Sequence, residues 1–177
     1  MSKVTKLHKE SSPTSVGVYV LTCSTSKFRE LQRKQEPGDE SGDTIAQLAA
    51  NAGNRIAGRK LIADSKSMIR KAVRSALANR NVDVVIVTGG TGLSRTDVTF
   101  ESVSPLLDRQ IPGFGEIFRR VSYDEIGSAA MMSRAFAGTI RGKAVFCLPG
   151  SPNGVKTAME KLILPELGHI IGLARGA

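Results

Sequence analysis

A run of β-branched residues near the middle of the chain constrains its fold more than any other feature. Five of the six residues from Val82 to Val87 are valine or isoleucine. Such a run is typical of a strand buried on both faces, and therefore of a central strand in a parallel sheet. Three glycines follow within four positions, at Gly89, Gly90 and Gly92. Glycine accepts positive φ and lets another molecule approach the backbone, so this loop predicts either an anion site or a plain turn into a helix.

The side chains that follow the glycines favour a binding loop over a plain turn. Arg95 offers donors suited to phosphate, and Asp97 offers a carboxylate for a divalent cation or a proton. Hydroxyl groups accompany them at Thr91, Ser94, Thr96 and Thr99. A turn requires none of these groups, so the pattern indicates a loop that binds phosphate or a cation.

Two common phosphate-binding motifs do not fit the chain. The dinucleotide-binding fingerprint would place its third glycine where Arg95 stands, packed against the helix. Residues 138–144 are one residue short of a P-loop, end in Ala144 in place of serine or threonine, and precede an apolar run. We interpret 138–144 as a hairpin turn.

Strand-like and helix-like segments alternate along the rest of the chain. Apolar runs predict strands over 16–23, 55–63, 135–140 and 144–148, and the sequence predicts helices over 44–50, 65–78, 100–108, 116–121, 126–132 and 155–171. Ser41 or Asp43 would cap the first of these helices, Pro165 would break or bend the last, and 24–38 would be a long polar connection. This alternation predicts an α/β fold whose ligands lie beyond the carboxyl ends of the strands.

Length and composition predict one ordinary globular domain. The chain has 177 residues, 41% of them hydrophobic, which is enough for a single core over 16–177. The polar stretch 1–15 predicts a flexible tail. No apolar run is long enough to cross a bilayer and no hydrophobic signal region is seen, so we expect a cytoplasmic protein without membrane partners. Cys23 and Cys147 each end an apolar run, which predicts buried free thiols.

The net charge of +9 raises the question of nucleic-acid binding. Basic residues are scattered along the chain and aromatic residues make up only 5% of it, so the stacking pattern of single-strand binders is missing. We therefore expect no nucleic-acid partner. A pocket for phosphorylated small molecules accounts for the same charge balance.

Several short blocks occur in the order seen in one known family. They are Thr88-Gly89-Gly90-Thr91-Gly92, Arg95-Thr96-Asp97-Val98-Thr99, Ile111-Pro112-Gly113-Phe114-Gly115-Glu116, Ser133-Arg134 and Leu148-Pro149-Gly150-Ser151-Pro152. Over roughly residues 16–171 the chain resembles the MoaB/MogA molybdenum-cofactor biosynthesis family. The resemblance implies a three-layer α/β sandwich with a mostly parallel central sheet. It also implies a domain that binds molybdopterin and, in the active members, adenylylates it with ATP and a divalent cation such as Mg²⁺.

The resemblance implies roles for residues that the local sequence explains more simply. Asp64 by itself predicts a helix N-cap and Ser133 a helix-end hydroxyl, whereas the family has a catalytic aspartate and a site serine at these positions. Asp64 and Asp97 would be catalytic and would hold the divalent cation. Phosphate groups and substrate would bind at Thr88, Gly89, Gly90, Thr91, Gly92, Ser94, Ser133, Gly150 and Ser151. A loop near the site would carry Asp39, Ser41 and Gly42.

The resemblance leaves two readings of the activity. Ser24-Thr25-Ser26 stands where family members often carry Ser-Asp-Thr or Ser-Asp-Arg, and some members keep the fold without adenylylation. A non-catalytic molybdopterin-binding or carrier protein is therefore the alternative to an adenylyltransferase that releases pyrophosphate. Family members assemble as trimers or hexamers, and a molybdenum-insertion protein could act downstream. The sequence decides neither between trimer and hexamer nor between molybdenum and tungsten.

Overall fold

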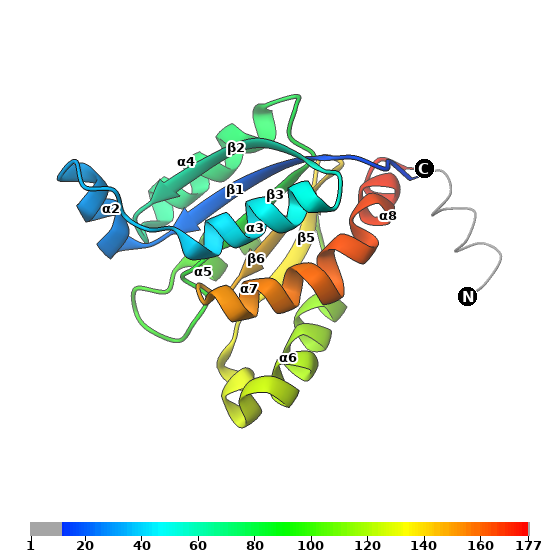
Figure 1. Cartoon of the computed structure of the whole chain (residues 1–177). Coiled ribbons are helices and arrows are strands. Elements are labelled where there is room, and N and C mark those ends of the chain that lie inside the picture. The colour runs from blue at the N-terminus through cyan, green and yellow to red at the C-terminus, as the bar shows by residue number, and fades with distance from the viewer. Residues whose placement is uncertain (1–11, 177) are drawn as a thin grey trace.

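Six strands form one sheet at the centre of the computed structural model, which describes residues 12–176 (Figure 1). Their order across the sheet is β2-β1-β3-β6-β5-β4. The bounds are β1 (Gly17–Cys23), β2 (Arg55–Ile62), β3 (Val84–Thr88), β4 (Arg109–Gln110), β5 (Phe136–Ile140) and β6 (Lys143–Leu148). Strands β2, β1, β3 and β6 run parallel, whereas β5 pairs antiparallel with β6 and β4 antiparallel with β5. The predicted α/β class with a mostly parallel sheet is confirmed.

The β-branched run is the central strand, as its composition predicts. Every residue of β3 is buried, and its register pairs Ile86 with Val20 of β1 and with Phe146 of β6. Alternate residues of β3 enter two separate cores: Val84 and Ile86 enter one, and their neighbours Val85 and Val87 enter the other. A strand with a core on each face needs apolar residues at every position, which explains the nearly unbroken run of valine and isoleucine.

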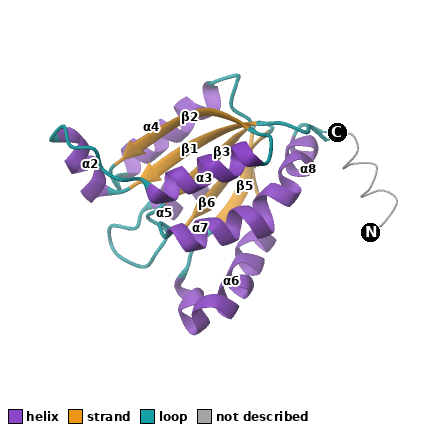
Figure 2. Cartoon of the chain, viewed as in Figure 1, coloured by secondary structure: helices purple, strands orange, loops and turns teal. Residues whose placement is uncertain are grey.

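Helices cover both faces of the sheet and make it the middle of three layers (Figure 2). One core packs the sheet against α3 (Glu40–Asn51), α6 (Pro112–Ile126), α7 (Pro152–Ala158), the π-helical turn η3 (Met159–Ile163) and α8 (Leu164–Ala174). The other core packs it against α4 (Lys66–Ala78) and α5 (Thr99–Val103), which is followed by the 3₁₀ turn η1 (Ser104–Leu106). Apolar residues at helical spacing on α4, such as Ile69 and Val73, provide its buried side.

The bend predicted at Pro165 has a structural counterpart. The last helical region is α7, then the π-helical turn η3, then α8 with Pro165 in its first turn. Proline lacks an N–H and its ring clashes with the preceding turn, so a wider π-helical turn before it relieves the clash. The region is longer than the predicted 155–171, since it extends from Pro152 to Ala174.

Some local predictions were wrong. Residues 24–38 are not simply a polar connection, because α2 (Thr25–Gln32) lies there with Ser24 as its N-cap. Helix α3 begins after Asp39, whose side chain accepts from the N–H of Gly42, so neither Ser41 nor Asp43 is its cap. The predicted helix over 126–132 is the 3₁₀ turn η2 (Gly127–Met132). The two-residue strand β4 was not predicted.

Other local predictions hold. The hairpin between β5 and β6 turns at Arg141 and Gly142, both with positive φ, as expected for a tight turn. Cys23 and Cys147 are buried and free. Most of the predicted tail, residues 1–11, lies outside the described residues. Among the described helices none combines the length and apolarity needed to span a membrane.

Candidate functional site

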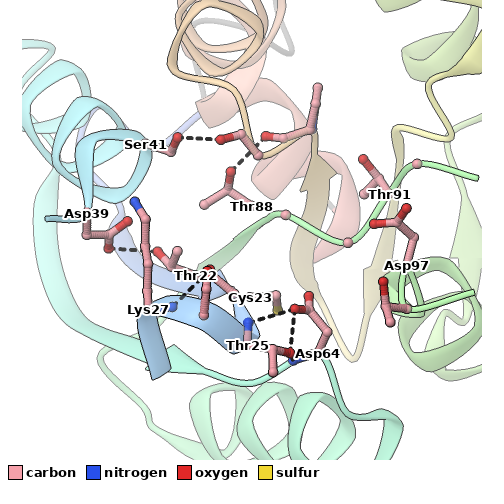
Figure 3. Close-up of a pocket in the computed structure, with 18 of the residues that line it drawn as sticks. Thr22, Cys23, Thr25, Lys27, Asp39, Ser41, Asp64, Thr88, Thr91 and Asp97 are labelled. Carbon is pink, nitrogen blue, oxygen red and sulfur yellow. Dashed lines mark hydrogen bonds between the residues drawn. The ribbon is translucent and has the colours of Figure 1, made fainter. Parts of the chain in front are cut away.

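A pocket of about 770 Å³ lies where the parallel strands end (Figure 3). The chain passes from β1 to β2 on one side of β1 and then returns to β3 on the other side. From β3 the order of strands continues to β6. Ligands of open α/β sheets bind at such a change of direction, beyond the carboxyl ends of the strands. The residues that follow β1, β2, β3 and β6 all contribute to the pocket wall.

The glycine loop forms the floor of this pocket. Gly89 has φ +97° and Gly90 has φ +65°, conformations that L side chains rarely adopt. A Cβ on Gly89 would lie 2.2 Å from the carbonyl oxygen of Cys23 at the end of β1. The loop is tied down by Gly89 N–H, which donates to Leu148 O at 3.1 Å, and by the Thr99 hydroxyl, which donates to Gly89 O at 2.8 Å. Glycine is required here because two strand ends approach one another closely.

Asp64 enters the pocket from the end of β2. Its Oδ2 accepts from the backbone N–H and from the hydroxyl of Thr25, both at 2.8 Å. It does not cap α4, because Ser65 holds the N-cap position and makes no side-chain cap bond. The local prediction of a helix cap was therefore wrong. Oδ1 lies beside the loop, since a Cβ on Gly90 would approach it to 3.2 Å.

Asp97 enters the pocket from the other side of the glycine loop. Its Oδ2 accepts from the backbone N–H of Ser94 at 2.8 Å. A Cβ on Gly92 would lie 2.8 Å from the same oxygen, so the carboxylate folds back over the loop. Figure 3 shows Asp64 and Asp97 on two sides of the loop, both beside the cavity.

Arg134 lies two residues before β5 and holds the glycine loop in place. Its guanidinium donates to Gly92 O at 2.8 Å and to Asp97 O at 2.7 Å, and its backbone N–H donates to Thr91 O at 3.0 Å. The same guanidinium is paired with the carboxylate of Glu101. This hydrogen bond lowers the pKa of Glu101 below its usual value. Arg134 therefore fixes the backbone on both sides of the Asp97 turn.

Hydroxyl groups join the loop after β6 to its neighbours. Thr88 donates to Pro149 O at 2.8 Å, and Ser41 donates to Gly150 O at 2.7 Å. Asp39, at the start of α3, accepts from the Thr22 hydroxyl at 2.8 Å and from Arg59 at 3.3 Å. These contacts fix the α3 side of the pocket.

Most of the residues singled out from the sequence come together in this pocket. Its lining includes Asp39, Ser41, Asp64, Thr88, Gly89, Gly90, Thr91, Gly92, Asp97, Ser133 and Gly150. Three others do not line it. Ser94 supports Asp97 through its backbone, Gly42 donates to Asp39, and Ser151 caps α7 by accepting from Gly154 N–H at 3.3 Å.

Several lining residues were not predicted from the sequence. Lys27 and Arg29 come from α2, and Met132 comes from η2 beside Ser133. The first two lie in a segment predicted to be a connection, so no pattern placed them near the strand ends. Arg95, which looked suited to phosphate, is exposed and does not line the pocket.

The cysteine in the pocket wall is not an activated thiol. Burial, together with the nearby carboxylate of Asp64, raises the pKa of Cys23 to about 12. A thiol with so high a pKa stays protonated at neutral pH and is a poor nucleophile.

The donor set of the pocket suits a hard divalent cation shared with a substrate. Within residues 12–176 no three His, Cys, Asp or Glu side chains are grouped to hold a metal ion. Mg²⁺ commonly uses one or two carboxylates and completes its shell with water and substrate phosphates. Asp64 and Asp97, with hydroxyl groups around them, match that class of ligand.

Comparison with known proteins agrees with this architecture. The family described as "Probable molybdopterin binding domain" matches residues 19–169. The chain belongs to this molybdenum cofactor biosynthesis family. Molybdenum cofactor biosynthesis protein B of Bacillus cereus is 45% identical over 92% of this chain and 93% of its own length. The Bacillus subtilis protein of the same name is 42% identical over 93% of each chain.

Solved structures of family members share the fold. A crystal structure of molybdenum cofactor biosynthesis protein B superposes with a TM-score of 0.85 at 44% identity, over 94% of this chain and 99% of that one. The tungsten cofactor synthesizing protein MoaB from Pyrococcus furiosus gives 0.83 at 39% identity, over 93% and 99%. The resemblance to the MoaB/MogA family seen in the sequence is confirmed.

Proposed function

We propose that this family member adenylylates molybdopterin, with ATP as the second substrate and a divalent cation such as Mg²⁺ as cofactor. The observation that carries the proposal is that Asp64 and Asp97 both line one pocket beside the glycine loop. Two carboxylates that face backbone amides and hydroxyls suit a reaction between phosphate groups. Membership of a molybdopterin-binding family names the acceptor.

The reaction forms one phosphoanhydride bond and breaks another. A phosphate oxygen of molybdopterin attacks the α-phosphorus of ATP, the bond from that phosphorus to the bridging β oxygen breaks, and pyrophosphate leaves. The attacking phosphate is already ionised at neutral pH, so the protein needs no strong base. Catalysis consists of positioning and of neutralising negative charge.

The residues of the pocket supply these two requirements. The amides of Gly90 and Gly92 and the Thr91 hydroxyl would bind phosphate oxygens, and Ser133 would orient the pterin. The Gly89 amide is already bonded to Leu148 O, so Gly89 would contribute by shaping the loop. Ser94 would act through the loop, because its backbone holds Asp97. Asp64 and Asp97 would hold Mg²⁺, which when bound would neutralise phosphate charge and withdraw electrons from phosphorus.

A single incubation tests the proposal. Purified protein is mixed with molybdopterin, ATP and Mg²⁺, and adenylylated molybdopterin and pyrophosphate are followed over time. We expect the wild type to form both products and Asp64→Asn and Asp97→Asn to lose at least about a hundredfold in rate, since each loses a charge from the cation site. Asp97→Asn should still bind molybdopterin.

A matched control separates the site from general charge effects. Asp43→Asn removes a carboxylate that is paired with Arg59 outside the pocket, and should leave the rate unchanged. Absence of product from the wild type, with molybdopterin bound, would favour the non-catalytic carrier. Equal loss of turnover and pterin binding in Asp97→Asn would remove Asp97 from the assigned role.

The same family membership leads us to propose the setting of the reaction. We infer a cytoplasmic homo-oligomer, trimeric or hexameric, that passes its product to a molybdenum-insertion protein. Nucleic acid has no place in this proposal. Tight and steeply salt-dependent binding of oligonucleotides at moderate salt would contradict it.

A further inference from the structure

Lys27 places an ammonium group in the pocket wall, and residues 12–176 provide no partner for it. The residue is half-buried on α2 and lines the cavity. Within the described part of the chain its side chain makes no hydrogen bond, and no carboxylate lies within 4.0 Å of its ammonium group; only its backbone N–H is bonded, to Ser24. A half-buried ammonium group loses part of its hydration and normally gains a partner in exchange.

Two carboxylates of the pocket wall, Asp39 and Asp64, are already engaged by other groups. Asp39 accepts from Thr22, from Gly42 and from Arg59. The Oδ2 of Asp64 accepts from the backbone N–H and from the hydroxyl of Thr25. The ammonium group of Lys27 is therefore free to meet an anion that enters the pocket. In Figure 3 its side chain extends from α2 toward the α3 side of the cavity.

Helix α2 offers a second cation and little packing. Arg29 also lines the pocket, is exposed, and makes no side-chain hydrogen bond or ion pair among the residues described. No residue of α2 is fully buried, so the helix contributes little to either core. Two cations that face one cavity from such a helix favour a ligand with several negative charges.

We propose that Lys27, assisted by Arg29, binds the β and γ phosphates of ATP. This inference rests on the proposed adenylylation, and it assigns the α2 side of the pocket to the triphosphate and the Ser133 side to the pterin. The terminal phosphates carry most of the charge of ATP. The leaving pyrophosphate gains further charge as its bond breaks, and a positioned ammonium group stabilises that charge.

A binding experiment tests the assignment without requiring turnover. Titration calorimetry with Mg²⁺ compares ATP, AMP and molybdopterin as ligands of the wild type, of Lys27→Gln and of Lys34→Gln. Lys34 is the matched control, because it follows the same helix, is exposed and does not line the pocket. We expect Lys27→Gln to raise the Kd for ATP about tenfold, which corresponds to the loss of one hydrogen bond to a charged group. Its Kd values for AMP and molybdopterin should change less than about twofold.

The possible outcomes separate this inference from the proposed function. Unchanged ATP binding by Lys27→Gln overturns the inference even if the wild type adenylylates molybdopterin. Equal weakening of ATP and AMP, or weakening of molybdopterin alone, overturns it as well. Selective loss of ATP binding supports it even if no adenylylated product is found. The melting temperature of Lys27→Gln should match that of the wild type, because the native side chain has no partner among the described residues to lose.

Discussion

At the scale of single residues, the close approach of two strand ends is the tightest constraint in the pocket. Gly89 combines φ +97° with a position where a Cβ would meet Cys23 O at 2.2 Å. We expect Gly89→Ala to lower the free energy of unfolding by about 2–4 kcal/mol, because backbone strain adds to overpacking. Urea unfolding followed by circular dichroism measures this loss.

Gly38→Ala is the control for that prediction. Gly38 is exposed, a Cβ there would meet no atom within 4 Å, and its φ is not positive. The substitution should change stability by less than about 0.5 kcal/mol. Similar losses in the two variants would mean that the pocket does not depend on the approach of the loop to β1.

The ion pair of Glu101 predicts a defined dependence of stability on pH. The hydrogen bond from Arg134 lowers the pKa of Glu101 below the usual value of 4.5. The folded state therefore favours the ionised form, so this stabilisation is complete above that value and is lost as the pH falls through the lowered pKa. We expect the stability difference between the wild type and Glu101→Gln to be constant from pH 7 to about pH 5, and to shrink below about pH 4.5.

Urea unfolding of both proteins at several pH values measures this difference. Other carboxylates titrate in the two proteins alike, so their contributions cancel. A difference that stays the same down to pH 3 would show that Glu101 does not owe its stabilising effect to its charge.

Part of the pocket is predictable from local sequence, and part is not. The glycine loop and Asp97 follow from residue types that are adjacent in the chain. The place of Asp64 does not, because a helix cap explains the same residue, and only its contact with Thr25 in three dimensions shows that it is not one. Lys27 reaches the pocket through the orientation of α2, which tertiary contacts determine.

At the scale of elements, predictability follows burial. The strands that became β1, β3 and β6 were predicted because two-sided burial requires nearly continuous apolar runs. Helix α2 buries no residue and has only two large apolar residues, Phe28 and Leu31, so its sequence reads as a polar connection. Strand β4 has two residues and is specified by its pairing with β5 alone.

The element that carries Asp97 depends on a contact from far along the chain. Residues 91–97 contain no regular helix or strand, and Arg134 binds the backbone at both ends of this segment. We expect Arg134→Lys to speed amide hydrogen exchange across 91–97 and to cost about 1–3 kcal/mol of stability. A lysine ammonium cannot reproduce the fork that joins Gly92 O, Asp97 O and Glu101. Exchange followed by mass spectrometry locates the effect.

Arg120→Lys is the control for the effect of Arg134→Lys on residues 91–97. Arg120 pairs with Asp124 on the exposed side of α6, with side chains that are 71% and 65% accessible. Exposed pairs of this kind contribute little, so neither exchange nor stability should change. Unaltered exchange over 91–97 in Arg134→Lys would mean that the loop is ordered without the guanidinium contacts.

At the scale of the whole molecule, one group of exposed apolar side chains reaches the edge of the pocket. α6 and η2 project from the sheet beside α7 (Figure 1). Their large apolar residues are exposed at Ile117, Tyr123, Ile126, Met131 and Met132. Exposed apolar groups of this kind mark surfaces that bind other proteins. Met132 also lines the pocket, so a neighbour that covers η2 would lie at the edge of the site.

This surface is where we expect the proposed oligomer to form. Met131 is 78% exposed and Ile117 53% exposed, and cyclic assembly would remove both from water without help from another protein. Wild-type protein should elute at three or six times the chain mass in chromatography with light scattering. Met131→Glu should shift it toward the monomer, because a carboxylate would be buried without a partner. Leu173→Glu, at an apolar residue on α8 that is 51% exposed, should not. A monomeric wild type would refute the assembly, and an equal shift in both variants would place the contact elsewhere.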